Sequence, residues 1–255
     1  GATCTVDDLS LRLTTILTHY GEIYLEGEGQ LLQDTGSVLV GDGSLEVTQQ
    51  GTGNSFRYNY WSSPVNSRGT DFTIGEVLRD GTDLDNIIDI DFGADYTYAD
   101  GVPSSAIKLS SYWMYKLEDS GLGYSAWAKV GNTEEVKVGQ GYSMKGSNTN
   151  AGEQNYTFEG KPNNGVIELT ISANNHHLVG NPYPSAIDAD KFIVDNGLTT
   201  GAIYYWEHYG GDTHLLSGYQ GGYATYNISG GTPASSNPRV SALGASEKGA
   251  PKQYI

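Results

Sequence analysis

The chain has 255 residues, of which 37% are hydrophobic, and its formal net charge is -16 at pH 7. An acidic surface repels the phosphates of nucleic acids and anionic lipids, so we expect neither as a partner. The single cysteine, Cys4, excludes an internal disulfide. No apolar run approaches the roughly 18 residues of a membrane span, so direct membrane insertion is not expected either.

Glycine and tyrosine dominate the composition, with 35 glycines and 19 tyrosines against only 2 methionines. Glycine favours turns, tyrosine favours strands, and methionine favours helices. The composition therefore predicts an all-β fold. We expect antiparallel β-sandwich-like units in a duplicated arrangement, with a small N-terminal β layer and one short helix.

The N-terminal β layer is predicted for residues 1–56. Short alternating runs at 23–25, 37–40 and 44–47 are separated by turns that contain glycine. Strands so short and so regularly spaced are typical of a meander or of the rungs of a small β-solenoid. Because three rungs would be marginal alone, we expect this layer to dock on the residues that follow.

A weak internal repeat divides the remainder into residues 57–177 and residues 178–255. Tyr112-Trp113 in the first copy corresponds to Tyr205-Trp206 in the second. The first part ends in a linking hairpin, predicted from Asn164-Gly165 between alternating strands. The second copy is expected to lack its last strand, which leaves an open sheet edge near Ile255.

One short helix is predicted after Pro184. Ser185 is the expected N-cap, with Asp188 three residues later in capping-box spacing, and Asn196-Gly197 should end the helix. Asn181-Pro182-Tyr183-Pro184 places two prolines around an aromatic residue. We therefore expect a strained turn at Pro182 or Pro184, for which a cis peptide bond before the proline is the form we consider.

An acidic run in the first copy is a candidate calcium site. Alternation along a strand would place Asp89, Asp91 and Asp95 on one face, with Asp83 and Asp85 as further ligands. Calcium takes six to eight oxygen ligands, which clustered carboxylates can supply. The alternative is a solvated acidic face with Ile90 and Phe92 turned to the core.

Aromatic residues in both copies are candidates for sugar binding, because flat rings stack on the apolar faces of pyranoses. The candidate ligand-binding residues are Trp113, Trp127, Tyr205, Trp206 and Tyr223. Packing in the core is the alternative, and their recurrence in both copies favours it. No GxSxG, HExxH or phosphate-loop motif is present, so we expect neither catalytic residues nor an enzyme.

Four motifs carry a resemblance to a known family. They are YNYWSSPV (58–65), VGQGYSMKG (138–146), FEGKPNNGVIELTI (158–171) and LVGNPYPSAIDADKFI (178–193). The chain resembles, from about residue 29 onward, a module of large cell-surface or adhesin-like proteins of Bacteroidota that the type IX secretion system exports. The family's C-terminal sorting domain is not seen here.

The resemblance implies an extracellular location on the surface of a Gram-negative bacterium and supplies no catalytic residues to transfer. We therefore expect a non-catalytic structural or adhesive module, with a carbohydrate-binding module of a larger adhesin or enzyme as the alternative. Its expected partners are neighbouring segments of the same protein, cell-surface glycans or other copies of itself. Apart from calcium, no cofactor is expected.

Overall fold

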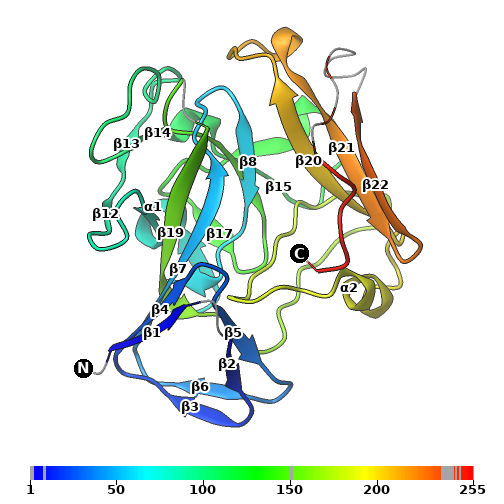
Figure 1. The fold of residues 1–255 in the computed structure, drawn as a ribbon. Coiled ribbons are helices and arrows are strands. Elements are labelled where there is room, and N and C mark those ends of the chain that lie inside the picture. Colours follow the sequence, from blue (N-terminus) through cyan, green and yellow to red (C-terminus); the bar gives the residue numbers. More distant parts are fainter. Residues whose placement is uncertain are drawn as a thin grey trace. The chain divides into compact units, whose positions relative to one another are not determined.

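The computed structural model describes residues 3–7, 10–149, 152–236, 244, 246 and 248–254 (Figure 1). Nearly all of its regular elements are strands, which confirms the predicted all-β fold. No helix among these residues has the length and apolar character that crossing a bilayer requires. Ile255, where we expected an open sheet edge, lies outside the described residues.

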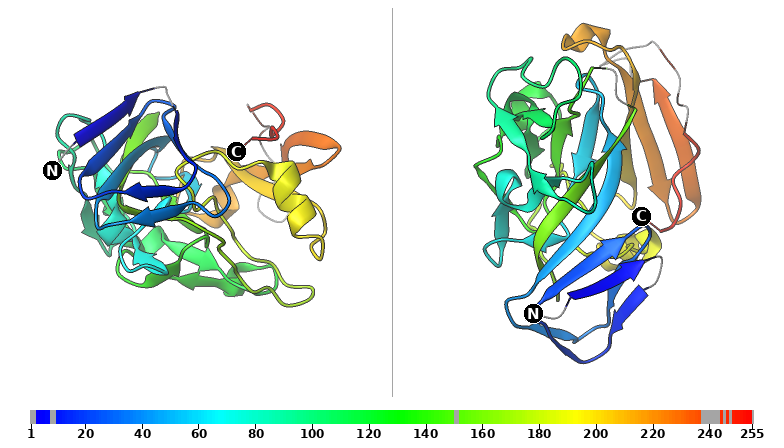
Figure 2. Two further views of the ribbon diagram at one scale, coloured as in Figure 1. Left: turned by 90° about the horizontal axis from the view of Figure 1, so that it is seen from below. Right: turned by 60° about the vertical axis from the view of Figure 1, so that its left-hand side comes forward.

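The N-terminal segment is a short parallel β-solenoid. Its strands are β1 (Thr3–Asp7), β2 (Ser10–Leu13), β3 (Ile16–Thr18), β4 (Glu22–Glu26), β5 (Gln30–Gln33), β6 (Val38–Val40) and β7 (Ser44–Thr52). β1, β4 and β7 pair in parallel, as do β2 with β5 and β3 with β6 (Figures 1 and 2). In the register Ile23 lies opposite Leu45, and both side chains are buried. The solenoid is confirmed, and the meander is excluded because its neighbouring strands would be antiparallel.

The solenoid continues directly into a larger sheet. β7 pairs antiparallel with β19 (Glu153–Pro162), and the sheet runs in the order β1-β4-β7-β19-β11-β12. β11 is Leu78–Asp80, β12 is Ile88–Asp89, and β9 (Val65–Asn66) also pairs with β19. The buried residues Leu45, Phe158 and Tyr156 belong to one core that spans both parts. The predicted docking of the N-terminal layer is confirmed.

Shorter strands complete this part of the chain. A four-stranded sheet has the order β16-β15-β18-β8, with β8 at Tyr58–Trp61, β15 at Tyr115–Leu117, β16 at Trp127–Lys129 and β18 at Tyr142–Lys145. Two strand pairs join β10 (Asp71–Thr73) to β17 (Glu135–Lys137) and β13 (Asp91–Gly93) to β14 (Lys108–Ser110).

A four-residue helix that we did not predict follows β10. It is α1 (Ile74–Val77), and the backbone N–H of Thr73, its N-cap, donates to Glu76 Oε2 at 3.3 Å. Thr-x-x-Glu is the capping-box spacing, so the sequence contained a signal for this turn.

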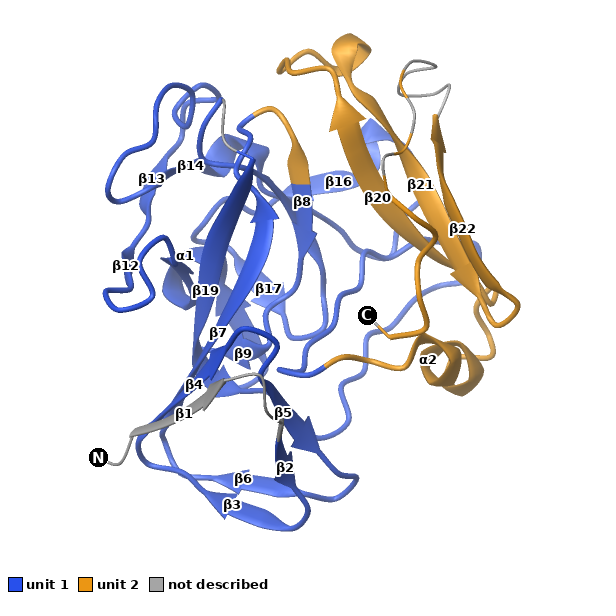
Figure 3. Cartoon of the chain, viewed as in Figure 1, with its two compact units in different colours: residues 1–55, 59–185 blue, residues 56–58, 186–255 orange. Residues whose placement is uncertain are grey.

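The chain forms two compact units (Figure 3). The first contains residues 1–55 and 59–185, and the second contains residues 56–58 and 186–255. The predicted divisions at 56/57 and 177/178 differ from these boundaries. The N-terminal layer belongs to the first unit because its β7 is hydrogen-bonded along most of its length to β19.

The second unit is an antiparallel sheet with one helix. The sheet has the order β20-β21-β22, with strands at Ile203–Gly210, Gln220–Asn227 and Gly230–Ser236. Helix α2 (Ala189–Asp195) packs Ala189 and Ile193 against Tyr226 of β21. The C-terminal segment joins this unit, because Ala189 N–H donates to the carbonyl of Gln253 at 2.8 Å.

The predicted helix is present, but its cap is corrected. Asp188, not Ser185, is the N-cap, and its carboxylate accepts from the backbone N–H groups of Asp190 and Lys191. A carboxylate is favoured there because it is ionised and meets the positive end of the helix. Asn196 is the C-cap, as expected.

Three further expectations are wrong. Trp113 ends a 3-10 turn (Ser111–Trp113), whereas Trp206 lies within β20, so their predicted correspondence fails. No strand follows β19 within residues 163–175, so Asn164-Gly165 does not link a hairpin. Among the described residues the single cis peptide bond joins Ser105 and Ala106, so the bonds before Pro182 and Pro184 are trans.

Candidate functional site

Residues from three of the four family-like motifs meet at the side chain of Asn163, which is only 3% exposed. Its Nδ2 donates to the carbonyls of Ser63 at 3.0 Å and Pro182 at 2.9 Å, and its Oδ1 accepts from Asn66 Nδ2 at 2.8 Å. We call Ser63, Asn66, Asn163 and Pro182 the motif junction. Both N–H donors and the carbonyl oxygen of this one amide are used there, which is typical of a structural role.

The solenoid is tied to the same place. Gln33 Nε2 donates to the Asn163 carbonyl at 3.0 Å, and the adjacent Asn164 Nδ2 donates to the Ser37 carbonyl at 2.8 Å. The N–H of Leu31 donates to the carbonyl of Pro184 at 2.8 Å. The motif junction therefore fixes the solenoid, β9 and the segment after β19 to one another.

The remaining motif is anchored nearby by backbone hydrogen bonds. Gly141 N–H donates to the Leu178 carbonyl at 2.8 Å, and Gly180 N–H donates to the Gly139 carbonyl at 3.0 Å. Ser62 Oγ donates to the carbonyl of Gln140, whose side chain is completely buried. A Cβ on Gly180 would lie 2.3 Å from that of Ser62, so glycine is required there by close approach.

The predicted calcium ligands do not form one cluster. Asp89 lies 3.4 Å from Arg79 Nε, Asp91 accepts from the Tyr98 hydroxyl at 2.7 Å, and Asp95 accepts from Thr97 N–H at 2.9 Å. The Thr97 bonds lower the pKa of Asp95.

Asp83 accepts from the N–H of Asp85 at 3.1 Å, and both side chains are exposed. Within the described residues no three His, Cys, Asp or Glu side chains converge as metal ligands would. The local contacts instead fit the alternative of a solvated acidic face, with Ile90 buried.

Calcium should therefore leave the melting temperature unchanged. The carboxylates at 89, 91 and 95 have separate local partners, and a cation would have to break these contacts before it could gather them. Thermal melts in calcium and in chelator provide the measurement. If calcium raised the melting temperature and Asp91→Asn abolished that increase, the result would contradict this expectation and restore the predicted site.

The aromatic candidates of the first unit lie in packed pairs. The indole Nε1 of Trp113 donates to the Tyr96 carbonyl at 2.7 Å, and its ring meets that of Tyr112 at 77°. Trp127 meets Tyr60 at 58° with 5.8 Å between ring centroids. Neither pair is coplanar, so neither provides the flat platform that we considered for sugars.

The aromatic candidates of the second unit lie on opposite faces of its sheet. Tyr205 pairs with Ala224 and packs towards α2, whereas Trp206 pairs with Tyr223 on the other face. Adjacent strand residues point in opposite directions, so Tyr205 cannot share a platform with Trp206. The Trp206 and Tyr223 rings are 5.1 Å apart and inclined at 63°. They pack edge to face instead of forming one plane.

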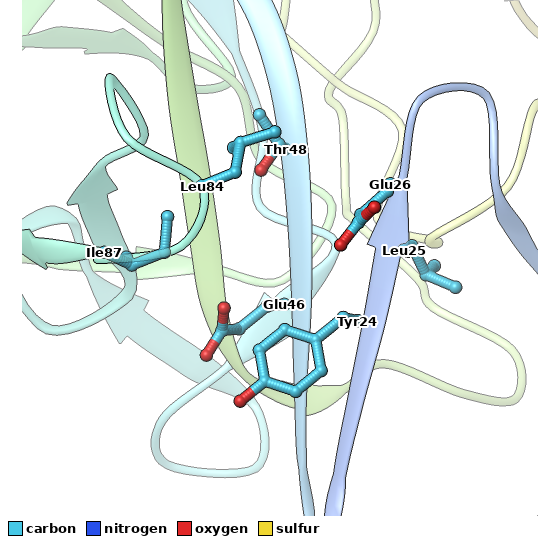
Figure 4. Close-up of a pocket in the computed structure, with 7 residues that line it drawn as sticks. All are labelled: Tyr24, Leu25, Glu26, Glu46, Thr48, Leu84 and Ile87. Atoms are coloured by element: carbon cyan, nitrogen blue, oxygen red, sulfur yellow. The ribbon is translucent and has the colours of Figure 1, made fainter. Parts of the chain in front are cut away.

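The carboxylate of Glu46 is unfavourably placed on the solenoid sheet, where its side chain lies beside the ring of Tyr24 (Figure 4). Glu46 of β7 lies directly between Tyr24 of β4 and Glu159 of β19 in the strand register. Burial, followed by the charges of Glu159 and Glu22, raises the pKa of Glu46 to about 6. The adjacent depression holds only about 10 Å³, too little for more than a water molecule.

Glu46→Gln should stabilise the chain by about 1 kcal/mol at neutral pH. The folded state binds the Glu46 proton more tightly than the unfolded state between about pH 4.5 and 6, so stability falls as pH rises through that window. Glutamine is uncharged, so it removes both the unfavourable burial of the Glu46 charge and the pH dependence of stability that comes from it. Urea denaturation across this range measures the effect, with the exposed Glu134→Gln as the matched control. Equal responses of the two variants would refute the assignment.

Sequence reasoning missed two buried polar residues. Asn163 and Lys145 each stand within a longer motif, and nothing in the sequence marks either one individually. Lys145 is 3% exposed, and its Nζ lies 3.8 Å from the centre of the Trp113 ring. Both lie inside the motifs that carry the resemblance. Their position inside these motifs is the signal that could have identified them.

Comparison with known families matches residues 94–251 to a domain of unknown function, DUF8693. The matched range includes parts of both compact units. No curated protein and no solved structure matches the chain. Because the match covers more than half of the 255 residues, the chain belongs to the DUF8693 family.

Proposed function

We propose that the chain is a non-catalytic extracellular module with a structural or adhesive role in a large bacterial surface protein. The motif junction is the observation that carries this proposal. The motifs with the most specific likeness to surface proteins make buried hydrogen bonds that hold segments together. Their chemistry is that of a scaffold and not of a reaction centre.

Two other features support a scaffold role. The solenoid strands continue without interruption into the sheet that contains β19, which gives a continuous hydrogen-bonded ladder through the first unit. The net charge of -16 keeps an exported surface soluble and resists non-specific aggregation.

Adhesion of coated beads tests the proposal. Beads that carry the chain should be retained on glass, polystyrene or a lawn of bacterial cells more strongly than albumin-coated beads. Asn163→Ala, which should loosen the scaffold, should reduce retention, whereas the adjacent Asn164→Ala should affect it less. Retention no greater than that of albumin on every surface would remove the adhesive role.

The carbohydrate-binding alternative is favoured by one observation. Tyr204 and Tyr223 are 57% and 37% exposed and lie on the same sheet face as Trp206. A glycan array at millimolar calcium separates the two functions. A selective glycan signal that Trp206→Ala abolishes would replace the scaffold proposal with the alternative, and an array without selective signals would retain it.

A further inference from the structure

The first unit contains a polar cleft that has no part in the proposed function. Its volume is about 460 Å³, within the range of small-molecule sites. The segment from β10 into α1 forms one wall, residues 89–92 form a second, and the turn at 132–133 forms a third. The side chains that line it include those of Arg68, Glu76, Asp89, Phe92, Asn132 and Thr133.

The walls of the cleft are held by fixed contacts. Gly75 N–H donates to the carbonyl of Asn132 at 2.8 Å, and a Cβ on Gly75 would lie 3.0 Å from that oxygen. Arg68 is held between Glu76 at 2.9 Å and Glu135 at 2.8 Å. The hydrogen bond from Arg68 lowers the pKa of Glu76 to about 2, so this network stays ionised at neutral pH.

Polar side chains with free hydrogen-bonding capacity line this cleft. The side chains of Asn132 and Thr133 make no hydrogen bond with any residue that the structure describes. The Asp89 side chain is 91% exposed, and its Oδ1 lies 3.4 Å from Arg79 Nε. These groups together offer an amide, a hydroxyl and a carboxylate to a ligand.

Apolar surface lies beside these groups. Phe92, which packs against the main core, lines the cleft together with Ile90, which is 7% exposed. A ligand that matches the site therefore needs both an apolar face and several hydroxyl groups. Aromatic rings and polar side chains placed together satisfy these two requirements for a sugar ring.

The charges in the cleft select a neutral ligand. Among the described residues that line the cleft, Arg68 is the one cation, and because two carboxylates already bind it, it is not available to an anionic ligand. Asp89 shares Arg79 with Glu159, which lies closer at 2.8 Å. A metal ion would nevertheless lack ligands here, because no three His, Cys, Asp or Glu side chains converge among the described residues. We propose that this cleft binds a neutral pyranose sugar, with Phe92 against the ring and with Asp89, Asn132 and Thr133 bonded to its hydroxyls.

Chemical-shift titration of the isotope-labelled chain tests the site. The probes are methyl glycosides of glucose, galactose, mannose and N-acetylglucosamine. At least one should shift the backbone signals of residues 89–92 and 132–133. Asp89→Asn and Asn132→Ala should each weaken that binding about tenfold, because each removes a hydrogen bond to the ligand. Both side chains lie outside the core, and Thr133→Val provides a further variant.

Matched controls distinguish this site from the rest of the molecule. Asp83→Asn alters an exposed carboxylate that does not line the cleft, and Tyr223→Ala removes an aromatic ring of the second unit; neither should change the affinity. No response to any of these glycosides would overturn the proposal. Shifts confined to Trp206 and Tyr223, or binding that Asn132→Ala and Asp89→Asn leave intact, would also overturn it. The scaffold role is independent of these results, because bead adhesion tests it separately.

Discussion

Asn163→Ala should lower the free energy of unfolding by about 3 kcal/mol. The change removes three side-chain hydrogen bonds at a position that is 3% exposed. It also leaves the Nδ2 group of Asn66 without its Asn163 acceptor, while the carbonyls of Ser63 and Pro182 each lose a donor. Such groups cost more than the lost bonds themselves, because water cannot replace the missing partner in a buried site. Chemical denaturation of the intact chain measures the difference.

The neighbouring Asn164→Ala is the matched control. Asn164 is the same residue type, is only half-buried, and makes one side-chain hydrogen bond, to the Ser37 carbonyl. We expect a loss of about 1 kcal/mol or less. If the two variants were equally stable, the motif junction would not be the point that holds the segments together, and the structural interpretation of the motifs would fail.

Local sequence patterns predicted the strands better than their pairing. The runs at 23–25 and 44–47 are alternating and glycine-bounded, and both form strands. Whether such strands pair in parallel or antiparallel depends on connections that a short pattern does not contain. For this reason the sequence allows both a meander and a solenoid, and the parallel pairing of β4 with β7, β2 with β5 and β3 with β6 distinguishes them.

The incorrect prediction of the helix N-cap also results from a contact that a local pattern does not contain. Ser185 and Asp188 are both acceptable N-caps. Gln253 favours Asp188, because its carbonyl accepts from the backbone N–H of Ala189 and its side-chain amide donates to the carboxylate of Asp188. That contact joins residues far apart in the sequence. The error at Tyr205 was avoidable, because strand alternation alone separates it from Trp206.

The candidate sites were the least predictable part. The calcium prediction assumed one continuous strand through residues 89–95, but β12 ends at Asp89 and β13 begins at Asp91, each with a different neighbour. Asn163 and the polar cleft depend on chain segments that approach only after folding. A single sequence gives the residue types at such places but not their convergence.

Lys145→Met should raise the free energy of unfolding by about 2 kcal/mol near pH 7. Burial lowers the pKa of Lys145 to about 7, and the charge of Asp100 opposes this shift. Its Nζ lies 3.8 Å from the centre of the Trp113 ring, which favours the charged form by about 1–2 kcal/mol and offsets part of the desolvation cost. Methionine fills the same volume without that cost.

The lowered pKa of Lys145 makes the stability of the natural chain depend on pH. An unfolded lysine titrates near about 10.4, so between about pH 7 and that value the unfolded state binds the Lys145 proton more tightly than the folded state. The stability of the natural chain should therefore rise with pH across the accessible range from 7 to 9, by up to about 1.4 kcal/mol per pH unit. Lys145→Met should abolish this rise.

Lys108→Met is the matched control for Lys145→Met, because Lys108 is exposed and its Nζ lies 5.4 Å from the centre of the Tyr98 ring. The stability of this variant should keep the slope of the natural chain, since an exposed ammonium is hydrated in both states. Urea denaturation of the three proteins at several pH values compares them. A Lys145→Met variant that is less stable than the natural chain at every pH would mean that the contact with Trp113 outweighs burial. Lys145 would then be a stabilising cation of the fold rather than a group whose burial opposes it.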